Sequence, residues 1–371
     1  MLQTLLILIF IRPFISSLAF PYLNFIYSVF LIGFLFILTI AKGIPLKKIQ
    51  ALKHPLLLFC LALIISVTFS SSEINSLKEI YKYVSGLLML LVAASLTYED
   101  RSRVIKTVVI AGFFISLLAI YQYFFGFQHI LNYMVKEKIS DSFALDYLER
   151  KRAFFPFITP NTLAGYLIMI IPLVLINKKR TWFIIPISFA LLLTKSLGAF
   201  LSIFLALGIY FYLQGKLEKR KVLFLFGTLV IIGLIFIVRS ATPKEHLKPI
   251  FSTMMRFNYW KETLIIIKAH PLSGVGIGNF DLIQSCFTHN SYLQIWAEMG
   301  ILGIFALLWV ILESLKAGFK KLIVTRKQDT ATICLLSANL AFLAHNFIDF
   351  TFFLPEINIV WWVLFGLLCS S

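Results

Sequence analysis

Residues 288–300 read THNSYLQIWAEMG, and this stretch joins a polar loop to a long apolar segment. The polar end holds His289, and the apolar part continues beyond Gly300. The longest polar segment of the chain, roughly Arg239 to Phe287, comes immediately before it. A histidine at the entry to a membrane helix is well placed for chemistry at a membrane surface. We therefore expect the rest of the chain to be a scaffold around this point.

The composition predicts an all-α polytopic membrane protein. The chain has 371 residues, of which 60% are hydrophobic, and its mean hydropathy is +0.90. Soluble domains of this length are less apolar, and apolar runs near the length of a membrane span recur along the whole sequence. No linker rich in Pro, Ser or Gly divides the chain, so residues 1–371 are expected to form a single integral membrane domain.

We predict about 12 membrane spans from apolar length and turn signals. Arg12-Pro13 interrupts the first span, which is therefore expected to be short or kinked. The first residues lack a charged region and a cleavage site, so we expect this span to be retained. The spans are expected near 3–20, 22–41, 55–71, 80–96, 105–126, 160–176, 182–194, 198–213, 222–238, 290–313, 331–348 and 357–369.

The basic residues predict the orientation. Five short loops on one side each carry at least three Lys or Arg, which is the signature of cytoplasmic loops. Both termini are therefore predicted to be cytoplasmic, and the net charge of +17 needs no nucleic-acid partner. The opposite side carries a smaller loop, 127–158, and a large loop, 239–288, between the ninth and tenth spans. The five basic loops are 42–53, 97–106, 177–180, 214–221 and 316–327.

Four residues on the outer side are candidates for a site because orientation does not require their charge. Arg256 and His289 bracket the large loop, Arg152 ends the smaller one, and Lys195 lies in a tight turn. Arginine binds phosphate oxygens in pairs, lysine adds a point charge, and a neutral histidine is a general base near pH 7. This set suits an anionic substrate with a proton to move. The alternatives are that the arginines anchor the bundle at lipid headgroups and that the histidine is structural.

The helix after His289 contains two further features. Glu298 lies about half a turn around the helix from His289, so we expect it to have a structural partner on a neighbouring helix. Gly300 and Gly303 fall on the face of His289 and are expected to let another helix pack closely.

Three more segments allow alternatives. The cluster GVGIG at 274–278 follows no strand and lacks nucleotide-loop spacing, which leaves a flexible loop or a backbone anion nest. His345 and Asp349 lie on one helical face; with His289 they form a weak metal candidate, although an Asp that orients an Arg or Lys is the simpler interpretation. Residues 258–270 predict an amphipathic interfacial helix that ends at Pro271.

These motifs together resemble the O-antigen ligase family, within the O-antigen ligase and polymerase superfamily. The resemblance covers about 150 to 350. The matching residues are Arg152 with Pro156, Pro160-Asn161-Thr162-Leu163-Ala164, Thr194-Lys195-Ser196-Leu197-Gly198-Ala199, Arg256-x-x-x-Trp260, His270-Pro271-Leu272-x-Gly274-Val275-Gly276-x-Gly278-Asn279-Phe280, His289-Asn290-x-x-Leu293 and Glu298-x-Gly300-x-x-Gly303.

The resemblance implies a GT-C-like membrane glycosyltransferase of the bacterial inner membrane. Such an enzyme moves a glycan from undecaprenyl diphosphate to a lipid A-core sugar hydroxyl, or a similar glycolipid acceptor, at the periplasmic face. The reaction is implied to be inverting and to need no metal or other cofactor. Two alternatives remain open: a polymerase that joins lipid-linked repeats, and a transporter of an anionic lipid-linked glycan. Transporters usually show internal repeats and broken helices at the membrane midplane.

The resemblance also implies roles for individual residues. His289 matches the base or acceptor-orienting residue, and Arg256 and Arg152 match residues that clamp the diphosphate. The family often has Ser-Arg-Gly where this chain has Ser196-Leu197-Gly198, so Lys195 would have to supply that charge. The predicted substrate-binding residues are Lys195, Asn290, Tyr259, Trp260 and Asp349.

Overall fold

The protein is described by a computed structural model. The structure describes residues 1–43, 49–136, 142–215, 218–242, 244–283, 285–325 and 329–369. Parts of the predicted basic loops 42–53, 214–221 and 316–327, and of the predicted outer loops 127–158 and 239–288, lie outside these ranges. Throughout the described ranges the regular elements are helices and there is no strand, which confirms the all-α class.

The α-helices are α1 Leu2–Ile11, α2 Pro21–Lys42, α3 Lys53–Thr68, α4 Glu73–Ser95, α5 Tyr98–Tyr121, α6 Phe127–Lys136, α7 Ser142–Glu149, α8 Pro160–Val174, α9 Ile184–Thr194, α10 Leu197–Leu213, α11 Lys219–Ser240, α12 Pro249–Ala269, α13 Ser291–Val324, α14 Thr330–His345 and α15 Pro355–Cys369.

Five described helical segments are long and apolar enough to cross a membrane. Several shorter apolar helices lie beside them, among them α8, α10, α14 and α15. The helical membrane architecture is therefore as predicted, while the number of spans and their sidedness stay predictions. The five segments are Pro21–Ala41, Gln50–Thr68, Tyr98–Lys136, Lys219–Ser240 and Ser291–Val324.

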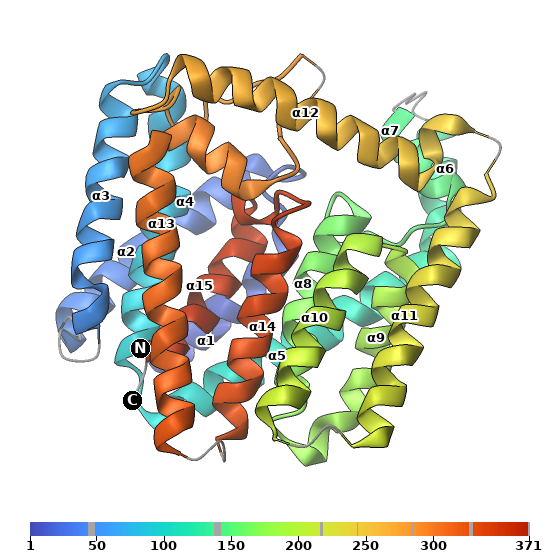
Figure 1. The fold of residues 1–371 in the computed structure, drawn as a ribbon, viewed down its shortest axis with the longest axis horizontal. Helices are drawn as coiled ribbons and strands as arrows, with labels where there is room; N and C mark the ends of the chain where they lie inside the picture. Colours follow the sequence, from blue (N-terminus) through green and yellow to red (C-terminus); the bar gives the residue numbers. More distant parts are fainter. Residues whose placement is uncertain are drawn as a thin grey trace.

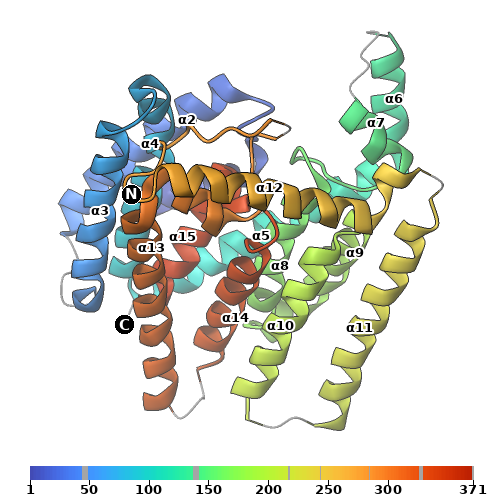
Figure 2. The same ribbon diagram turned by 45° about the horizontal axis from the view of Figure 1, so that its top comes forward.

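The helices form a bundle with α12 lying across one end of it (Figure 1). Every described residue of α15 is buried, so this helix is the centre of the core. By contrast, α11 has no buried residue and stands at the periphery, as the turned view in Figure 2 also shows. Apolar side chains that face outward are stable in lipid, which is as apolar as they are.

The first helix is short, as its sequence predicts. α1 ends at Ile11, and Arg12–Phe14 continue as a 3-10 turn. The Arg12 side chain is fully buried; it lies 3.6 Å from the Glu356 carboxylate and donates a hydrogen bond of 2.7 Å to Asn24 Oδ1. A buried charge needs such partners because an unpaired one is far more costly.

α13 is broken at Gly300, whose φ of 64° and ψ of −169° are not helical. The break leaves backbone groups without partners in the helix. The Val275 N–H donates to Ala297 O at 2.9 Å, and the Gly276 N–H donates to Glu298 O at 3.0 Å. On the other side of the break, the Ile301 N–H donates to Pro271 O at 3.0 Å. The predicted span near 290–313 overlaps the candidate span Ser291–Val324, but its helix is broken at Gly300.

The glycine cluster 274–278 is the segment that fills this break. Its amide groups are used inside the protein, since the Ile277 N–H also donates to Ser66 Oγ at 3.1 Å. The segment is therefore a hydrogen-bonded loop, and the anion that its backbone contacts is a carboxylate of this chain, because the Gly278 N–H donates to the Glu298 side chain. A side chain at Gly300 would meet the backbone of Leu272. The close neighbour of Gly300 is therefore the loop that follows α12, and not the predicted second helix. Gly303 instead faces Met299 of its own helix.

α12 is longer than the predicted interfacial helix over 258–270. It begins at Pro249, where a proline at the first helical position loses no hydrogen bond, and it ends at Ala269. The following loop is joined to the break in α13, so the C-terminal end of α12 is held against the bundle.

Replacing Gly300 with alanine is expected to lower the free energy of unfolding by about 1–3 kcal/mol, because this backbone conformation suits only glycine. The added Cβ would also overlap the Leu272 carbonyl group. Denaturant unfolding in detergent micelles measures the change. Gly208→Ala in α10 is the control, because nothing lies within 4 Å of its added Cβ and no positive φ is involved. Equal stability of the two variants would contradict the assignment.

Candidate functional site

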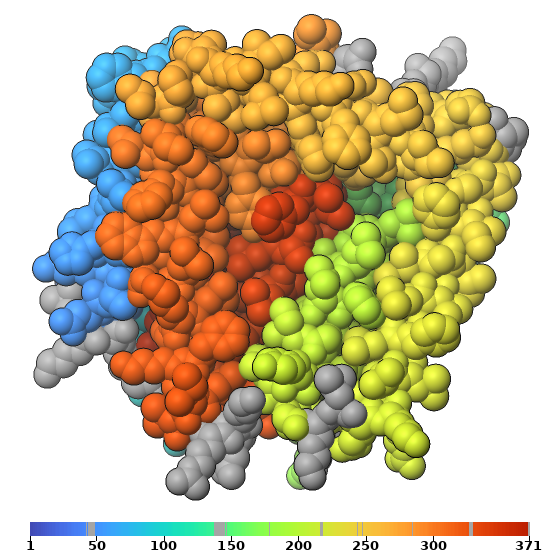
Figure 3. All heavy atoms as spheres, in the orientation of Figure 1, coloured from blue at the N-terminus to red at the C-terminus, as the bar shows by residue number. Residues whose placement is uncertain are grey.

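A cavity of about 660 Å³ lies beneath α12. Figure 3 shows the hollow below α12, between the α14–α15 segment and the helices α10 and α11. Several parts of the chain line it: the N-terminal half of α12 with the turn before it, the end of α7 and the residues that follow, the start of α8, the turn between α9 and α10, His289 before α13, and the segment that joins α14 to α15. The end of α11 adds Phe236 and Arg239.

Six of the residues predicted from the sequence line this cavity, and two do not. Arg256, Tyr259 and Trp260 come from α12. The six predicted residues that line the cavity are Arg152, Arg256, Tyr259, Trp260, His289 and Asp349. Lys195 and Asn290 lie beside it in supporting positions described below.

His289 is held between aromatic rings. Its imidazole stacks on Tyr259 with ring centroids 5.9 Å apart and meets Phe350 edge-on at 5.0 Å. The Nδ1 atom is buried and has no hydrogen-bond partner. Burial lowers the pKa of His289 to about 4; Asp349 opposes this shift and Arg256 adds to it. The imidazole is therefore neutral at pH 7, in the form that accepts a proton.

Arg256 and Arg152 line the same cavity but differ in how their nitrogens are used. Arg256 donates only from Nη1, to Ser252 Oγ at 3.1 Å, and its buried Nε has no partner. Arg152 donates from Nε to Thr194 O at 2.8 Å and from Nη2 to Asn161 Oδ1 at 2.9 Å. Burial, and then the positive charge of Arg239, hold the pKa of Arg152 well below its usual range. Arg256 is thus freer to bind an anion, and Arg152 also ties α8 to α9.

Among the described residues, Asp349 is the one acidic side chain that lines the cavity, and it lies 3.9 Å from His345. In the part of the chain that the structure describes, none of Arg152, Arg239 and Arg256 forms a salt bridge. Arg239 donates to Lys195 O at 3.3 Å, and its buried Nε has no partner. Several arginines placed together repel one another, and an anion bound among them removes that cost.

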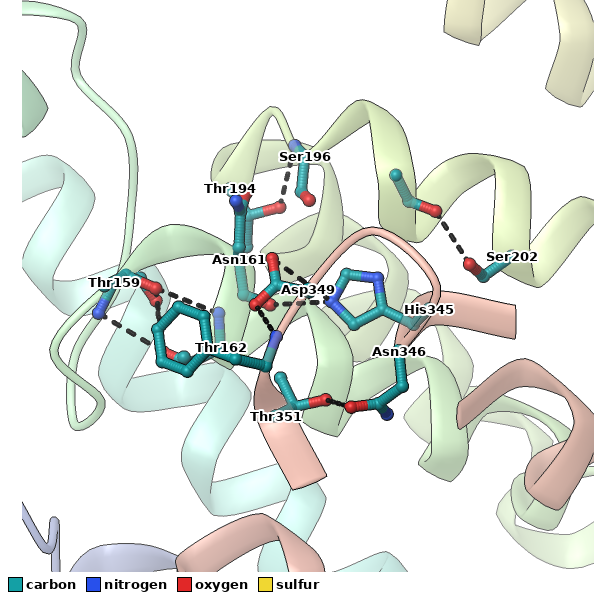
Figure 4. A network of polar contacts seen from close by, with 12 residues as sticks. Thr159, Asn161, Thr162, Thr194, Ser196, Ser202, His345, Asn346, Asp349 and Thr351 are labelled. Carbon is teal, nitrogen blue, oxygen red and sulfur yellow. Dashed lines mark hydrogen bonds and ion pairs between the residues drawn. The ribbon is translucent and has the colours of Figure 1, made fainter. Parts of the chain in front are cut away.

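Asp349 faces a histidine and not an arginine or lysine. Figure 4 shows His345 and Asp349 side by side next to Asn161. Asp349 Oδ2 lies 3.9 Å from His345 Nε2, and Oδ1 accepts the Phe350 N–H at 2.8 Å. The interpretation that Asp349 orients an Arg or Lys is therefore wrong. The metal alternative also lacks support, because among the described side chains no group of three His, Cys, Asp or Glu is arranged to hold a metal ion.

Asn346 joins the start of α13 to the segment after α14. Its Oδ1 accepts from Ser291 Oγ at 2.7 Å, from Thr351 Oγ1 at 3.2 Å and from the Phe352 N–H at 2.9 Å. Its backbone carbonyl accepts the Ser291 N–H at 2.9 Å. These bonds fix the end of α13 that follows His289.

Lys195 and Asn290 support the cavity from outside. Lys195 caps α9, and its Nζ donates to Arg150 O at 2.8 Å. Burial lowers its pKa, and the charges of Arg152, Lys151 and Arg239 lower it further. Asn290 is the N-cap of α13, where its Oδ1 accepts the N–H groups of Tyr292 and Leu293 at 3.1 Å each. In this structure both residues act on the backbone.

The backbone around the cavity is strained at three positions. Among the described non-glycine residues, a positive φ occurs at Lys151 (47°), Lys195 (51°) and His289 (54°). Such conformations are uncommon for these residue types and persist only where the surrounding structure holds them. All three residues flank the cavity or lie in it, so this region holds its side chains in defined positions.

Several residues that line the cavity had no role assigned from the sequence. Arg150 and Arg239 are outward basic residues, His246 carries no signal of its own, and Asn161 belongs to a matched motif without a role. His345 and Asp349 were singled out together, and they lie side by side. Their approach depends on the packing of α8, α11 and α14, which no local pattern records.

The fold and the cavity define the class of protein: a helical membrane protein with a cationic cavity beneath α12, at one end of its bundle. Residues 181–308 match the family model described as O-antigen ligase. This match confirms the resemblance found in the sequence, and members of the family are glycosyltransferase-like membrane enzymes. Of the predicted site residues, Arg152 and Asp349 lie outside the matched segment.

One relative was found among curated proteins. It is a protein of Haemophilus influenzae (strain ATCC 51907 / DSM 11121 / KW20 / Rd), described as an uncharacterized protein. It is 23% identical over 198 residues, which cover 42% of this chain and 49% of the relative. The chain thus spans about half the length of the curated relative that it matches.

His289 makes stability depend on pH. Its pKa is about 4 in the folded protein and about 6.5 in an unfolded chain, so the unfolded state binds more protons between these values. Stability is therefore expected to fall as the pH drops from about 6.5 to 4, by about 3 kcal/mol from this residue. Unfolding of wild type and His289→Gln in detergent across this range measures the difference. Parallel curves for the two proteins would contradict it.

Proposed function

We propose that this protein is an O-antigen ligase-like glycosyltransferase. It would move a glycan from undecaprenyl diphosphate to a sugar hydroxyl of lipid A-core, at the periplasmic face of the bacterial inner membrane. The observation that carries the proposal is the cavity in which neutral His289 and Arg256 lie together with Arg152 and Arg239, three arginines that form no salt bridge with the described residues. The family match over residues 181–308 supports the same class.

The charge of the cavity suits a diphosphate leaving group. Arg256 has donors available on its guanidinium, and Arg239 lies nearby with an unpartnered Nε. Guanidinium groups bind phosphate oxygens in pairs, and cations aimed at a leaving diphosphate stabilise the charge that develops on it. The volume of about 660 Å³ leaves room for sugar beside the diphosphate.

The edge of the cavity suits a lipid chain. Leu201, Phe236 and Phe257 line it and are largely exposed, at 47%, 41% and 52%. Exposed apolar side chains at the mouth of a cationic cavity match a donor with a polar head on a hydrocarbon chain. This combination favours a lipid-linked substrate over a soluble sugar nucleotide.

In the proposed reaction the acceptor oxygen forms a bond to the anomeric carbon of the donor sugar. The bond from that carbon to the diphosphate oxygen breaks, and its electron pair leaves with the diphosphate. The acceptor proton passes to His289. Burial is the main cause of the low pKa of His289 and Arg256 is a smaller one; the bound diphosphate offsets the charge of Arg256 and so removes that smaller cause, which makes His289 a better base. Attack opposite the leaving group inverts the anomeric centre.

His289→Ala and Arg256→Ala are each expected to lower the rate of glycan transfer by about 10²–10⁴-fold, because each removes a group that acts in the transition state. Transfer is measured in proteoliposomes with the lipid-linked donor and lipid A-core acceptor. Matched controls are His129→Ala on α6 and Lys261→Ala on α12, because both residues are exposed and outside the cavity. Retained activity in both site variants would rule out this site assignment.

The acceptor is tested by supplying the donor with and without lipid A-core. Transfer only when the core is present supports the ligase. Growth of the lipid-linked glycan without core would assign a polymerase to the same cavity. Movement of the glycan across the proteoliposome membrane without formation of a covalent bond would show that the protein is a transporter and not a transferase.

A further inference from the structure

A second cavity, of about 310 Å³, lies at the opposite end of the same helices. α8 contributes Asn161 to the first cavity and Leu173 to the second. α14 contributes His345 to the first and Ala331 to the second. α8 has 15 residues, so the two cavities lie about 20 Å apart along the bundle. The second cavity is thus separate from the proposed transfer site.

The second cavity has a cationic part and an apolar wall. Its charged residues are Arg101 and Lys106 on α5 and Arg180 in the turn between α8 and α9. Among the described residues, no acidic side chain lines it. The α5 residues recur at helical spacing and so form one face. The lining residues are Tyr98, Arg101, Ser102, Ile105, Lys106, Val109, Leu173, Val174, Ile176, Asn177, Arg180 and Ala331.

Arg101 is a built part of this cavity and not a surface charge. Only 2% of the Arg101 surface is exposed. Its Nη2 donates a hydrogen bond of 3.3 Å to Thr332 Oγ1, and its buried Nε has no hydrogen-bond partner. Asp329 lies near Arg101 but is already engaged. It accepts from the Thr332 N–H at 3.0 Å and Oγ1 at 2.5 Å, and it lies 3.8 Å from Lys321 Nζ.

Lys106 and Arg180 are likewise without an acidic partner. Across the described ranges, neither they nor Arg101 form a salt bridge. Glu99 and Asp100 belong to the first turn of α5 but do not line the cavity. Three cations, one of them buried, therefore line the cavity, while Asp329, whose charge acts on Arg101, is not among the described residues that line it.

We propose that this second cavity binds a phosphate group, as carried by the headgroup of an anionic phospholipid. Basic pockets between membrane helices bind such headgroups, and Arg and Lys together match a phosphodiester. Ile105, Val109 and Leu173 continue the cavity with an apolar wall against which the first part of an acyl chain packs. Free phosphate offers the same anion without the chain, so the two sources are separated by experiment.

The test uses the full chain in detergent micelles and follows Tm during titration. The probes are phosphatidylglycerol, zwitterionic phosphatidylcholine and inorganic phosphate. Phosphatidylglycerol is expected to raise Tm saturably and phosphatidylcholine is not. In the double variant Lys106→Gln/Arg180→Gln, the half-saturating mole fraction of phosphatidylglycerol is expected to rise about 30-fold, because each basic residue near a membrane surface contributes about fivefold. A saturable rise with inorganic phosphate as well would show that the anion alone suffices.

The matched control is Arg103→Gln/Lys179→Gln, which removes the same charge from exposed residues at the same end that do not line the cavity. It is expected to keep the wild-type response. Comparable Tm values without lipid show that both double variants fold. The proposal is overturned if neither anionic lipid nor phosphate shifts Tm, or if the control loses the response as fully as the cavity variant.

Discussion

The geometry of the cavity depends on the break in α13 at Gly300. A helix that is broken inside an apolar bundle leaves carbonyl groups that lipid and side chains cannot satisfy, at a cost of about 1–3 kcal/mol for each unpaired group. The loop 274–278 supplies the missing donors to Ala297 and Glu298, and Pro271 accepts the Ile301 N–H. The same bonds hold the segment that follows α12. The break therefore decides where α12 lies, and with it where Arg256 stands above His289.

The second constraint is the charge of the cavity. Arg152 uses its guanidinium to join two helices, whereas Arg256 keeps donors available towards the space beneath α12. The two residues are alike in sequence terms and differ in what surrounds them. Burial among aromatic rings and beside Arg256 keeps His289 neutral. A cavity lined by several cations disfavours the binding of another positive charge and favours the binding of an anion. This preference is the physical link between the fold and the proposed chemistry.

Much of the site was predictable because it rests on local signals. His289 follows the longest polar segment and Arg256 lies within it, and both line the cavity. The glycine cluster was recognised, but its role was not, because the donors it offers are taken by a helix break that no periodicity records. Asp349 was expected near a cation and lies beside His345. Lys195 and Asn290 cap helices in the structure, and their binding of substrate stays a prediction.

The sequence by itself determined the helical membrane class, because apolar length and the distribution of basic residues are local properties. It also determined which residue types were available for chemistry with a phosphate. Only the tertiary structure decided which of them share a cavity, because the approach of Arg239 and His345 depends on the packing of helices far apart in the chain. It also decided which nitrogens remain free, since hydrogen bonds such as that from Arg152 to Thr194 form only after the turns have docked.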